Sequence, residues 1–179
     1  MSEAIILHGV FLEILGVGVL LEGPSGVGKS ALALELINRG HKLIADDAPE
    51  FSCCSSATIQ GSCPQLLQDF LEVYGLGVLN ISAMFGTEAV AASAQLQLLI
   101  TLLNAAQFQP AGEEYLHGCR EQRTLLGVEL PVVKLPVIPE RDMATMVECV
   151  VRNHILRTGG YDSSGVFASR QRSIAGEKR

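Results

Sequence analysis

The sequence contains no tryptophan, and aromatic residues make up only 5% of its 179 residues. It also lacks an excess of basic charge, because 13 lysines and arginines face 19 acidic residues and give a formal net charge of −6. A nucleic-acid-binding surface needs a basic face, and a single-strand binder needs aromatic side chains on which bases stack. The composition therefore argues against a nucleic-acid partner.

Long hydrophobic runs are missing as well. The most apolar part of the chain is interrupted by His8, Glu13 and Glu22, so no run reaches the roughly 18 residues that a membrane span requires. Glu3 and the lack of a small-residue cleavage site argue against a secretory signal. We therefore expect no membrane partner and a cytoplasmic location.

What the chain does contain fits one globular domain of ordinary size. Hydrophobic residues make up 48% of the sequence, which is enough for a full core. The five cysteines show no paired CxxC spacing, so we expect reduced thiols rather than a metal site or a disulfide framework. We expect the domain to span residues 1–165 and a polar tail to follow over 166–179.

Hydrophobic patterns predict an α/β fold for the first part of the chain. We expect two strands, a helix and a third strand, over 4–14, 17–22, 30–39 and 41–45 in that order. Gly40 is a typical residue for the end of such a helix. A strand, a loop, a helix and a further strand form the signature of a βαβ unit in an α/β sheet.

The middle of the chain gives weaker signals. We expect a hairpin at a sheet edge over 48–65 and a glycine-broken, strand-like run over 70–82. Residues 88–106 fit a helix, a strand, or one leading into the other, and the polar residues 107–129 are expected to form a loop. Three prolines favour a sheet edge or an extended connector for 129–139.

The last predicted helix begins at Asp142, whose side chain can cap it. One face of this helix carries apolar residues, namely Met143, Met146, Val147, Val150 and Val151. The polar residues 162–179 are expected to fray.

Residues 23–30, GPSGVGKS, match the phosphate-binding pattern G-x-x-x-x-G-K-[ST] at every fixed position. Glycines let backbone N–H groups approach a polyphosphate because no Cβ atoms intrude, and the helix that follows turns its positive dipole end toward it. Lys29 would add a mobile charge for the β and γ oxygens, and Ser30 a hydroxyl ligand for Mg²⁺. We predict that the nucleotide contacts Gly23, Pro24, Ser25, Gly26, Val27, Gly28, Lys29 and Ser30.

Asp46 and Asp47 follow the strand predicted over 41–45. Adjacent side chains at a strand end point to different sides. One carboxylate could therefore reach Mg²⁺ while the other meets the hydroxyl that accepts a phosphoryl group.

Three segments resemble the catalytic domain of the HPr kinase/phosphorylase family. They are residues 8–47, which contain the phosphate-binding loop and RGHKLIADD, residues 71–86, which begin LEVYGLG, and residues 135–167. The combination of the phosphate-binding loop with RGHKLIADD and LEVYGLG is specific, because other families with this loop lack RGHKLIADD and LEVYGLG. The resemblance covers nearly the whole chain and does not extend to the family's usual N-terminal domain.

The resemblance implies an enzyme that uses ATP and Mg²⁺ to phosphorylate a serine of HPr, a carrier protein of the sugar phosphotransferase system. It also implies the reverse reaction, in which inorganic phosphate removes the phosphoryl group and pyrophosphate is released. The implied fold is a single-domain α/β P-loop kinase core similar to phosphoenolpyruvate carboxykinase, and the implied assembly is a hexamer.

The family's functional residues can be carried over to matching positions. Asp47 matches the acid/base that takes the serine proton, and His8 matches an active-site histidine. Lys29 and Ser30 keep the roles given above. The resemblance makes Glu72 a Mg²⁺ ligand beside Ser30 and Asp46. It also matches Arg141 to an arginine implicated in the reverse reaction.

The chain departs from the family pattern at positions that would handle phosphate charge. Ala31 stands where glutamate is usual, Tyr74 where arginine is usual and Asn80 where aspartate is usual. His117 lies in register with another expected arginine, and Arg120 and Arg123 are nearby candidates to replace it.

These departures leave two alternatives to the protein kinase. One is a degenerate module that senses nucleotide and regulates a partner without turnover. The other is a small-molecule kinase on the same core, for which residues 107–127 are long enough to form a lid.

Overall fold

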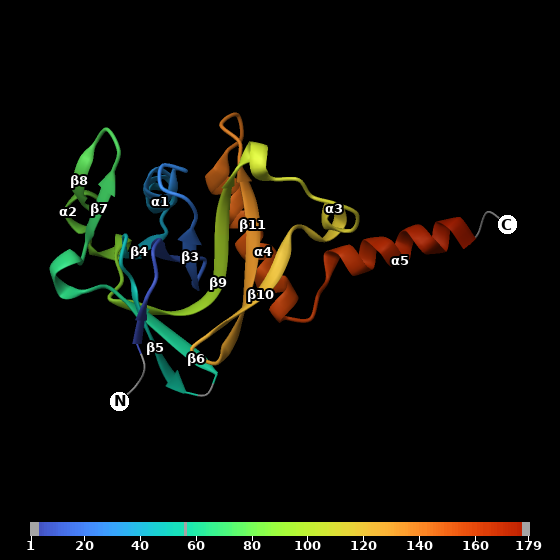
Figure 1. Cartoon of the computed structure of the whole chain (residues 1–179), viewed down its shortest axis with the longest axis horizontal. Helices are drawn as coiled ribbons and strands as arrows, with labels where there is room; N and C mark the ends of the chain where they lie inside the picture. Colours follow the sequence, from blue (N-terminus) through green and yellow to red (C-terminus); the bar gives the residue numbers. More distant parts are fainter. Residues whose placement is uncertain (1–3, 56, 177–179) are drawn as a thin grey trace.

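The computed structural model describes residues 4–55 and 57–176, and these form a curled sheet with helices packed against it (Figure 1). The strands are β1 (Ala4–Ile6), β2 (Val10–Ile14), β3 (Val17–Glu22), β4 (Lys42–Ala45), β5 (Glu50–Ser55), β6 (Thr58–Ser62), β7 (Phe70–Val73), β8 (Gly77–Asn80), β9 (Ser93–Asn104), β10 (Arg120–Leu125) and β11 (Val128–Val137). The helices are α1 (Lys29–Asn38), α2 (Ile81–Phe85), α3 (Glu114–His117), α4 (Met143–Thr158) and α5 (Ser163–Gly176). None of the helices within this described part is long and apolar enough to cross a membrane.

The long strand β9 organises the sheet. The strand order is β1-β5-β6-β9-β3-β2-β4, and β11 adds to β9 with β10 on its outer side. The first residues of β9 pair antiparallel with β6, whereas the rest of the strand pairs parallel with β3 and β11. Strands β7 and β8 form a separate hairpin that stands at one end of the molecule beside α1 (Figure 1).

The predicted βαβ unit is present, with one strand inserted. Strand β2 lies between β3 and β4 and is antiparallel to both, so β3 and β4 run in the same direction. Their carboxyl ends therefore meet at one edge of the sheet, together with the amino end of β2. This edge brings three chain segments together: the residues before Val10, the loop after Glu22 and the residues after Ala45.

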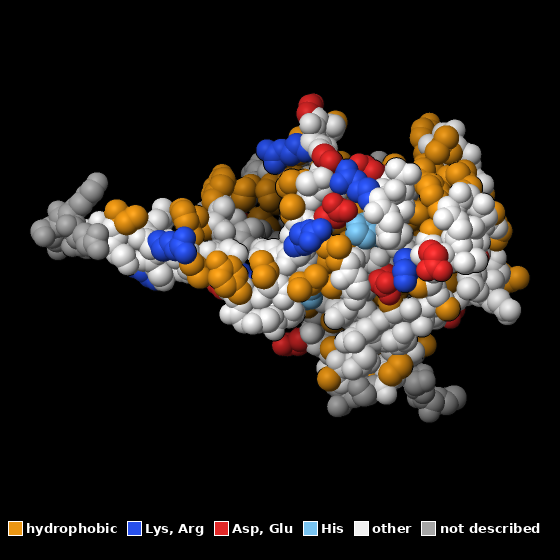
Figure 2. Space-filling model, turned by 180° about the vertical axis from the view of Figure 1, so that it is seen from behind, with side chains coloured by type: hydrophobic (Ala, Val, Ile, Leu, Met, Phe, Trp, Pro, Cys, Tyr) orange, Lys and Arg blue, Asp and Glu red, His pale blue; other side chains and the backbone are white. Residues whose placement is uncertain are grey.

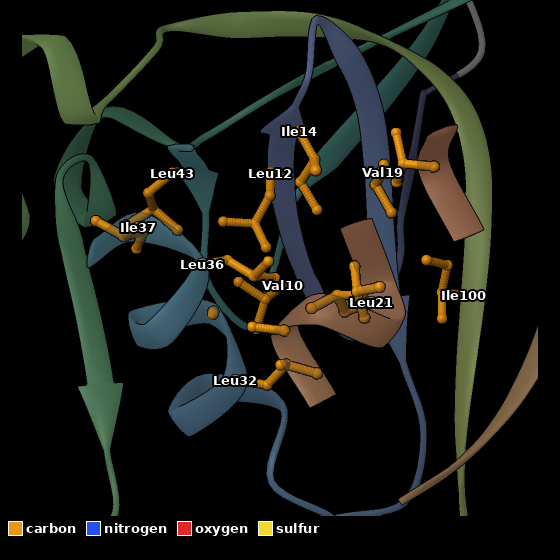
Figure 3. Packing of buried hydrophobic residues seen from close by; sticks show 14 of the residues in the cluster. Val10, Leu12, Ile14, Val19, Leu21, Leu32, Leu36, Ile37, Leu43 and Ile100 are labelled. Carbon is orange, nitrogen blue, oxygen red and sulfur yellow. The ribbon is translucent and has the colours of Figure 1, made fainter. Parts of the chain in front are cut away.

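Alternating side chains on β2 and β3 build two cores. Val10, Leu12 and Leu21 belong to the core on the α1 side of the sheet, and Figure 3 shows Val10 and Leu12 beside Leu36 of α1. Helix α4 covers the same face with Ala144, Val147 and Val151. Of the predicted apolar stripe, Val147 and Val151 are buried and Met143, Met146 and Val150 are partly buried against this core, whereas Ala144 was not predicted.

On the opposite face of the sheet, Phe11 and Leu20 pack in the second core with the β5–β6 hairpin. The rings of Phe11 and Phe51 meet edge to face with centroids 5.0 Å apart. Gly61 lies against both rings, and a Cβ at this position would be 2.5 Å from each of them. The predicted hairpin over 48–65 is thus confirmed and closes this core, although β1 rather than the hairpin forms the edge of the sheet.

Several predictions about secondary structure were wrong. The expected strand over 4–14 is two strands, since residues 7–9 turn between β1 and β2. Residues 107–129 are not a loop, because they contain α3 and β10. The expected fraying of 162–179 is contradicted over most of its length by α5, which projects away from the body of the molecule (Figure 1). The open choice for 88–106 resolves as strand β9.

The proline-rich segment 129–139 also differs from expectation, since β11 lies between β9 and β10 and not at an edge. Lys134 donates its backbone N–H to the carbonyl of Cys119, so the backbone N–H and C=O groups of the even-numbered residues of β11 point toward β10. Those of the odd-numbered residues point toward β9. Pro136 faces the β10 side beyond the end of β10, and Pro131 faces β9 just before their pairing begins. Both prolines therefore occupy positions where the ladder needs no N–H donor.

Candidate active site

The loop between β3 and α1 has the backbone shape of a phosphate cradle. Gly26 and Gly28 adopt positive φ angles of 77° and 104°, which L side chains rarely adopt, and Gly28 caps the helix. A Cβ at either position would meet no protein atom within 4 Å, so it would project into the space where a ligand is expected. Gly23 is required for a different reason, because a Cβ there would lie 2.5 Å from the carbonyl oxygen of Leu102.

Lys29 lies at the first position of α1 and turns back over this loop. Its Nζ donates hydrogen bonds to the carbonyl oxygens of Gly23 at 2.9 Å and Pro24 at 3.1 Å. These bonds hold the ammonium group at the mouth of the loop. The positive end of the α1 dipole and the Lys29 charge therefore act on the same point, which suits a polyphosphate.

A cleft of about 860 Å³ opens over the loop at the shared edge of β2, β3 and β4. Most of the predicted site residues line it, namely His8, Gly23, Ser25, Gly26, Gly28, Lys29, Ser30, Asp46, Asp47 and Glu72. Ala31 and Tyr74, two departures from the family pattern, line it as well. Residues far apart in the sequence thus meet around the loop.

His8 and Asp47 form the outer end of this cleft. His8 Nδ1 lies 3.7 Å from Asp47 Oδ1, and both side chains are more than 80% exposed, at 88% and 86%. Asp47 has a positive φ angle of 65°, a backbone conformation that aspartate tolerates better than most residues. The turn after β4 therefore presents this carboxylate to solvent, where an incoming hydroxyl group can reach it.

Asp46 has a different environment from its neighbour. Its Oδ2 accepts a hydrogen bond of 2.9 Å from the backbone N–H of Glu72, which ties the end of β4 to β7. Burial raises the pKa of Asp46 above its ordinary value, and the nearby charges of Asp47 and Glu72 raise it further, while the bond from the Glu72 N–H opposes them. Asp46 thus positions the β7–β8 hairpin over the cleft, in addition to any contact with a ligand.

The oxygen donors in the cleft fit a magnesium ion. Within residues 4–55 and 57–176, no group of three or more His, Cys, Asp and Glu side chains is arranged to hold an ion alone. Ser30, Asp46 and Glu72 nevertheless line one cleft beside the phosphate loop. Magnesium is usually held by one or two carboxylates together with substrate phosphates and water, so this donor set suits it.

An ion pair beneath the loop was not predicted from the sequence. Arg123 donates two hydrogen bonds to Glu22, of 2.7 and 2.8 Å, and Thr101 donates a third of 2.6 Å. Burial by itself would raise the pKa of Glu22, but the bonds from Arg123 and Thr101 together leave it below its ordinary value. Since Glu22 directly precedes Gly23, this network fixes the start of the phosphate loop against β9 and β10.

Some predicted residues lie elsewhere. Arg141 and Val27 line a second, smaller cavity on the other side of the first turn of α1. Arg120, half-buried, donates to the carbonyl of His117, and the ring of His117 is hydrogen-bonded to Ser164 of α5 at 2.7 Å. Neither these residues nor Arg123 is among the cleft-lining residues.

Asn80, where the family usually has aspartate, has a structural role. Its side chain accepts a hydrogen bond from the N–H of Ala83 and caps α2.

Among the described residues that line the cleft, Lys29 is the one lysine or arginine.

Comparisons with known proteins identify the family of this chain. The family model described as HPr Serine kinase C-terminal domain matches residues 1–171. The chain is 46% identical over 175 residues to proteins named HPr kinase/phosphorylase from Stenotrophomonas maltophilia (strain K279a) and Xanthomonas campestris pv. campestris (strain B100). Each alignment covers 97% of this chain and 55% of the relative, so the chain spans about half the length of these relatives.

A solved structure, the Hpr(Ser) kinase/phosphatase from Coxiella burnetii, has the same fold. It superposes with a TM-score of 0.83 at 33% sequence identity, covering 91% of this chain and 98% of that one. The predicted α/β kinase core is thereby confirmed. The family match extends over nearly the whole chain, and the chain belongs to the HPr serine kinase C-terminal domain family.

Proposed function

We propose that this chain transfers the γ-phosphoryl group of ATP to a serine hydroxyl of HPr. In the reverse direction, inorganic phosphate attacks phosphoserine-HPr, and the products are HPr and pyrophosphate. The observation that carries the proposal is the exposed His8–Asp47 pair, 3.7 Å apart, at the outer end of a phosphate-loop cleft. The names of the relatives support the choice of acceptor.

Each residue of the cleft has a role in this reaction. The loop N–H groups and Lys29 hold the β and γ phosphates, and Asp47 accepts the proton of the serine hydroxyl as the new P–O bond forms. His8 lies beside Asp47 and orients its carboxylate. A magnesium ion, held by Ser30 with Asp46 or Glu72, would neutralise phosphate charge when bound. In the reverse direction Asp47 returns the proton to the serine oxygen.

An exposed apolar surface beside the cleft supports a protein acceptor over a small metabolite. Tyr74, Leu76 and Val78 of the β7–β8 hairpin are 104%, 62% and 67% exposed. Figure 2 shows hydrophobic side chains gathered over this hairpin, and Tyr74 also lines the cleft. Apolar patches of this kind mark protein interfaces, and a protein that presents a serine to Asp47 would lie against this one.

The assembly and the location belong to the same proposal. We infer a hexamer from the family resemblance, and a light-scattering mass near that of one chain would contradict it. Cys54, Cys63, Cys119 and Cys149 are free thiols in the structure, which supports a reducing compartment such as the cytoplasm.

A two-way phosphoryl assay tests the function. One arm contains HPr, ATP and Mg²⁺, and the other contains phosphoserine-HPr with inorganic phosphate. Transfer in both arms supports the full proposal, and an Asp47→Asn variant is the matched control that must be inactive in both. Transfer only in the arm that contains ATP would show that the protein is a one-way kinase. No transfer in either arm with ATP still bound would favour the nucleotide-sensing module.

A further inference from the structure

A second cavity, of about 250 Å³, lies next to the phosphate-loop cleft. The two cavities meet at the first turn of α1, where Gly28 and Ala31 line both of them. Ala31 carries a single methyl group, so no long side chain separates the two spaces at this point. The second cavity has no part in the reaction described above, although it adjoins the loop that would hold the phosphates.

The position of the catalytic pair fixes the direction of a bound triphosphate. The phosphate that is transferred must lie toward His8 and Asp47, at the outer end of the cleft. The opposite end of the triphosphate then leads away from this pair, along the first turn of α1 and past Ala31. We propose that the second cavity binds the nucleoside of the phosphoryl donor, an inference that rests on the proposed function.

The walls of the cavity suit a nucleoside. Val137 is half-buried and supplies apolar surface for the flat face of a base, whereas Val27 and Leu102 are 8% and 0% exposed and close the cavity on its inner side. Arg141 is exposed at the rim, where its planar guanidinium group can stack on the opposite face of the base. The wall therefore combines an apolar floor with a cation that recognises an aromatic ring.

Two polar contacts hold the rim in shape. Arg141 donates its backbone N–H to the carbonyl of Ile138 at 3.0 Å, which fixes the turn that leads into α4. Glu35, on the same cavity, is held by Arg39 through an ion pair of 3.0 Å. Its carboxylate can accept a hydrogen bond from an amino group of a base or from a ribose hydroxyl group. Under this proposal Arg141 binds the nucleoside, rather than the phosphate or pyrophosphate of the reverse reaction.

Calorimetric binding of two probes, ATP and inorganic triphosphate, tests the inference. We expect the wild-type chain to bind ATP more tightly than triphosphate. Arg141→Ala should weaken ATP binding about tenfold and leave triphosphate binding within twofold, because only the stacking contact is lost. Pro139→Trp, which fills the cavity from an exposed position, should have the same selective effect. Glu140→Ala, an exposed neighbour that does not line the cavity, is the matched control.

The outcomes separate this inference from the proposed function. Equal loss of ATP and triphosphate binding in Arg141→Ala would show that Arg141 contacts phosphates. Unchanged ATP binding in both Arg141→Ala and Pro139→Trp would show that the nucleoside does not bind in this cavity. Either result overturns the inference while the phosphate loop keeps its role. A wild-type chain that binds neither probe would overturn the proposed function together with it.

Discussion

Removing the cation beneath the phosphate loop should destabilise the fold by a predictable amount. In an Arg123→Met variant, Glu22 loses two charge-assisted hydrogen bonds, of 2.7 and 2.8 Å, and keeps only the bond from Thr101. The Glu22 side chain is 17% exposed, so water cannot fully replace the lost donors. Because the Arg123 side chain is 35% exposed and partly screened, we expect a net loss of about 2 kcal/mol rather than the full cost of a buried pair.

The assay is thermal unfolding followed by circular dichroism. In a domain of this size each 1 kcal/mol lowers Tm by about 2–4 °C, so Arg123→Met should melt about 4–8 °C below the wild type at pH 7. Lys134→Met is the matched control, since Lys134 is on the same β10–β11 hairpin but pairs with Glu121, and both side chains are more than 40% exposed. Its Tm should change by less than about 2 °C.

The pH dependence provides a second check on the same ion pair. The pKa of Glu22 is depressed below its ordinary value of 4.5, so its contribution is present above pH 4.5 and is lost as the pH falls through the folded pKa. The gap in Tm between the wild type and Arg123→Met should therefore narrow below pH 4.5. Equal Tm values for Arg123→Met and Lys134→Met at pH 7 would refute the reasoning. A Tm difference between the wild type and Arg123→Met that stays constant below pH 4.5 would refute it as well.

Three further predictions concern the site and the sheet. Asp47→Asn should lower the rate of transfer to HPr by at least about 100-fold and change the Kd for ATP only a few-fold, because proton acceptance is lost while the phosphate loop is intact; persistent transfer would exclude Asp47 as the base. Lys29→Ala should weaken ATP binding more than about tenfold in calorimetry, and near-normal affinity would contradict the role of the loop. Gly18→Ala should destabilise the fold by about 3 kcal/mol in urea titrations, because a Cβ there would overlap the carbonyl oxygen of Gln95 on β9. An unchanged midpoint of urea unfolding would show that β3 and β9 move apart to accommodate the methyl group without loss of stability.

The parts of the site that could be predicted from the sequence depend on local patterns. The loop over 23–30 identifies itself because glycines, a lysine and a serine have fixed spacing and precede a helix. Asp46 and Asp47 follow a short apolar strand, and the order of strand, helix and strand is enough to place them at the same edge of the sheet as the loop. The contact between this edge and His8 follows once β2 is inserted between β3 and β4.

Strand β9 could not be assigned because it lacks a period. Its central residues Leu98, Leu99 and Ile100 are buried on both faces of the sheet, so apolar side chains follow one another without the alternation of a half-exposed strand. Strand β10 was predicted as part of a loop because it is too polar, whereas the centre of β9 is apolar. It is short, charged and on the outer side of β11, and such a polar edge strand has the composition of a loop.

The positions of Glu22, Arg123 and Arg141 all depend on β9 and its neighbours. Glu22 and Arg123 are 101 positions apart, and they meet only because β9 pairs with β3 on one side and β11 on the other. The same arrangement carries β11 past the phosphate loop, so the turn after it brings Arg141 to the second cavity rather than to the cleft. A motif can therefore identify a residue as functional, but which part of the substrate that residue contacts is decided by the sheet order. Under the proposal made for the second cavity, this order brings Arg141 to the nucleoside.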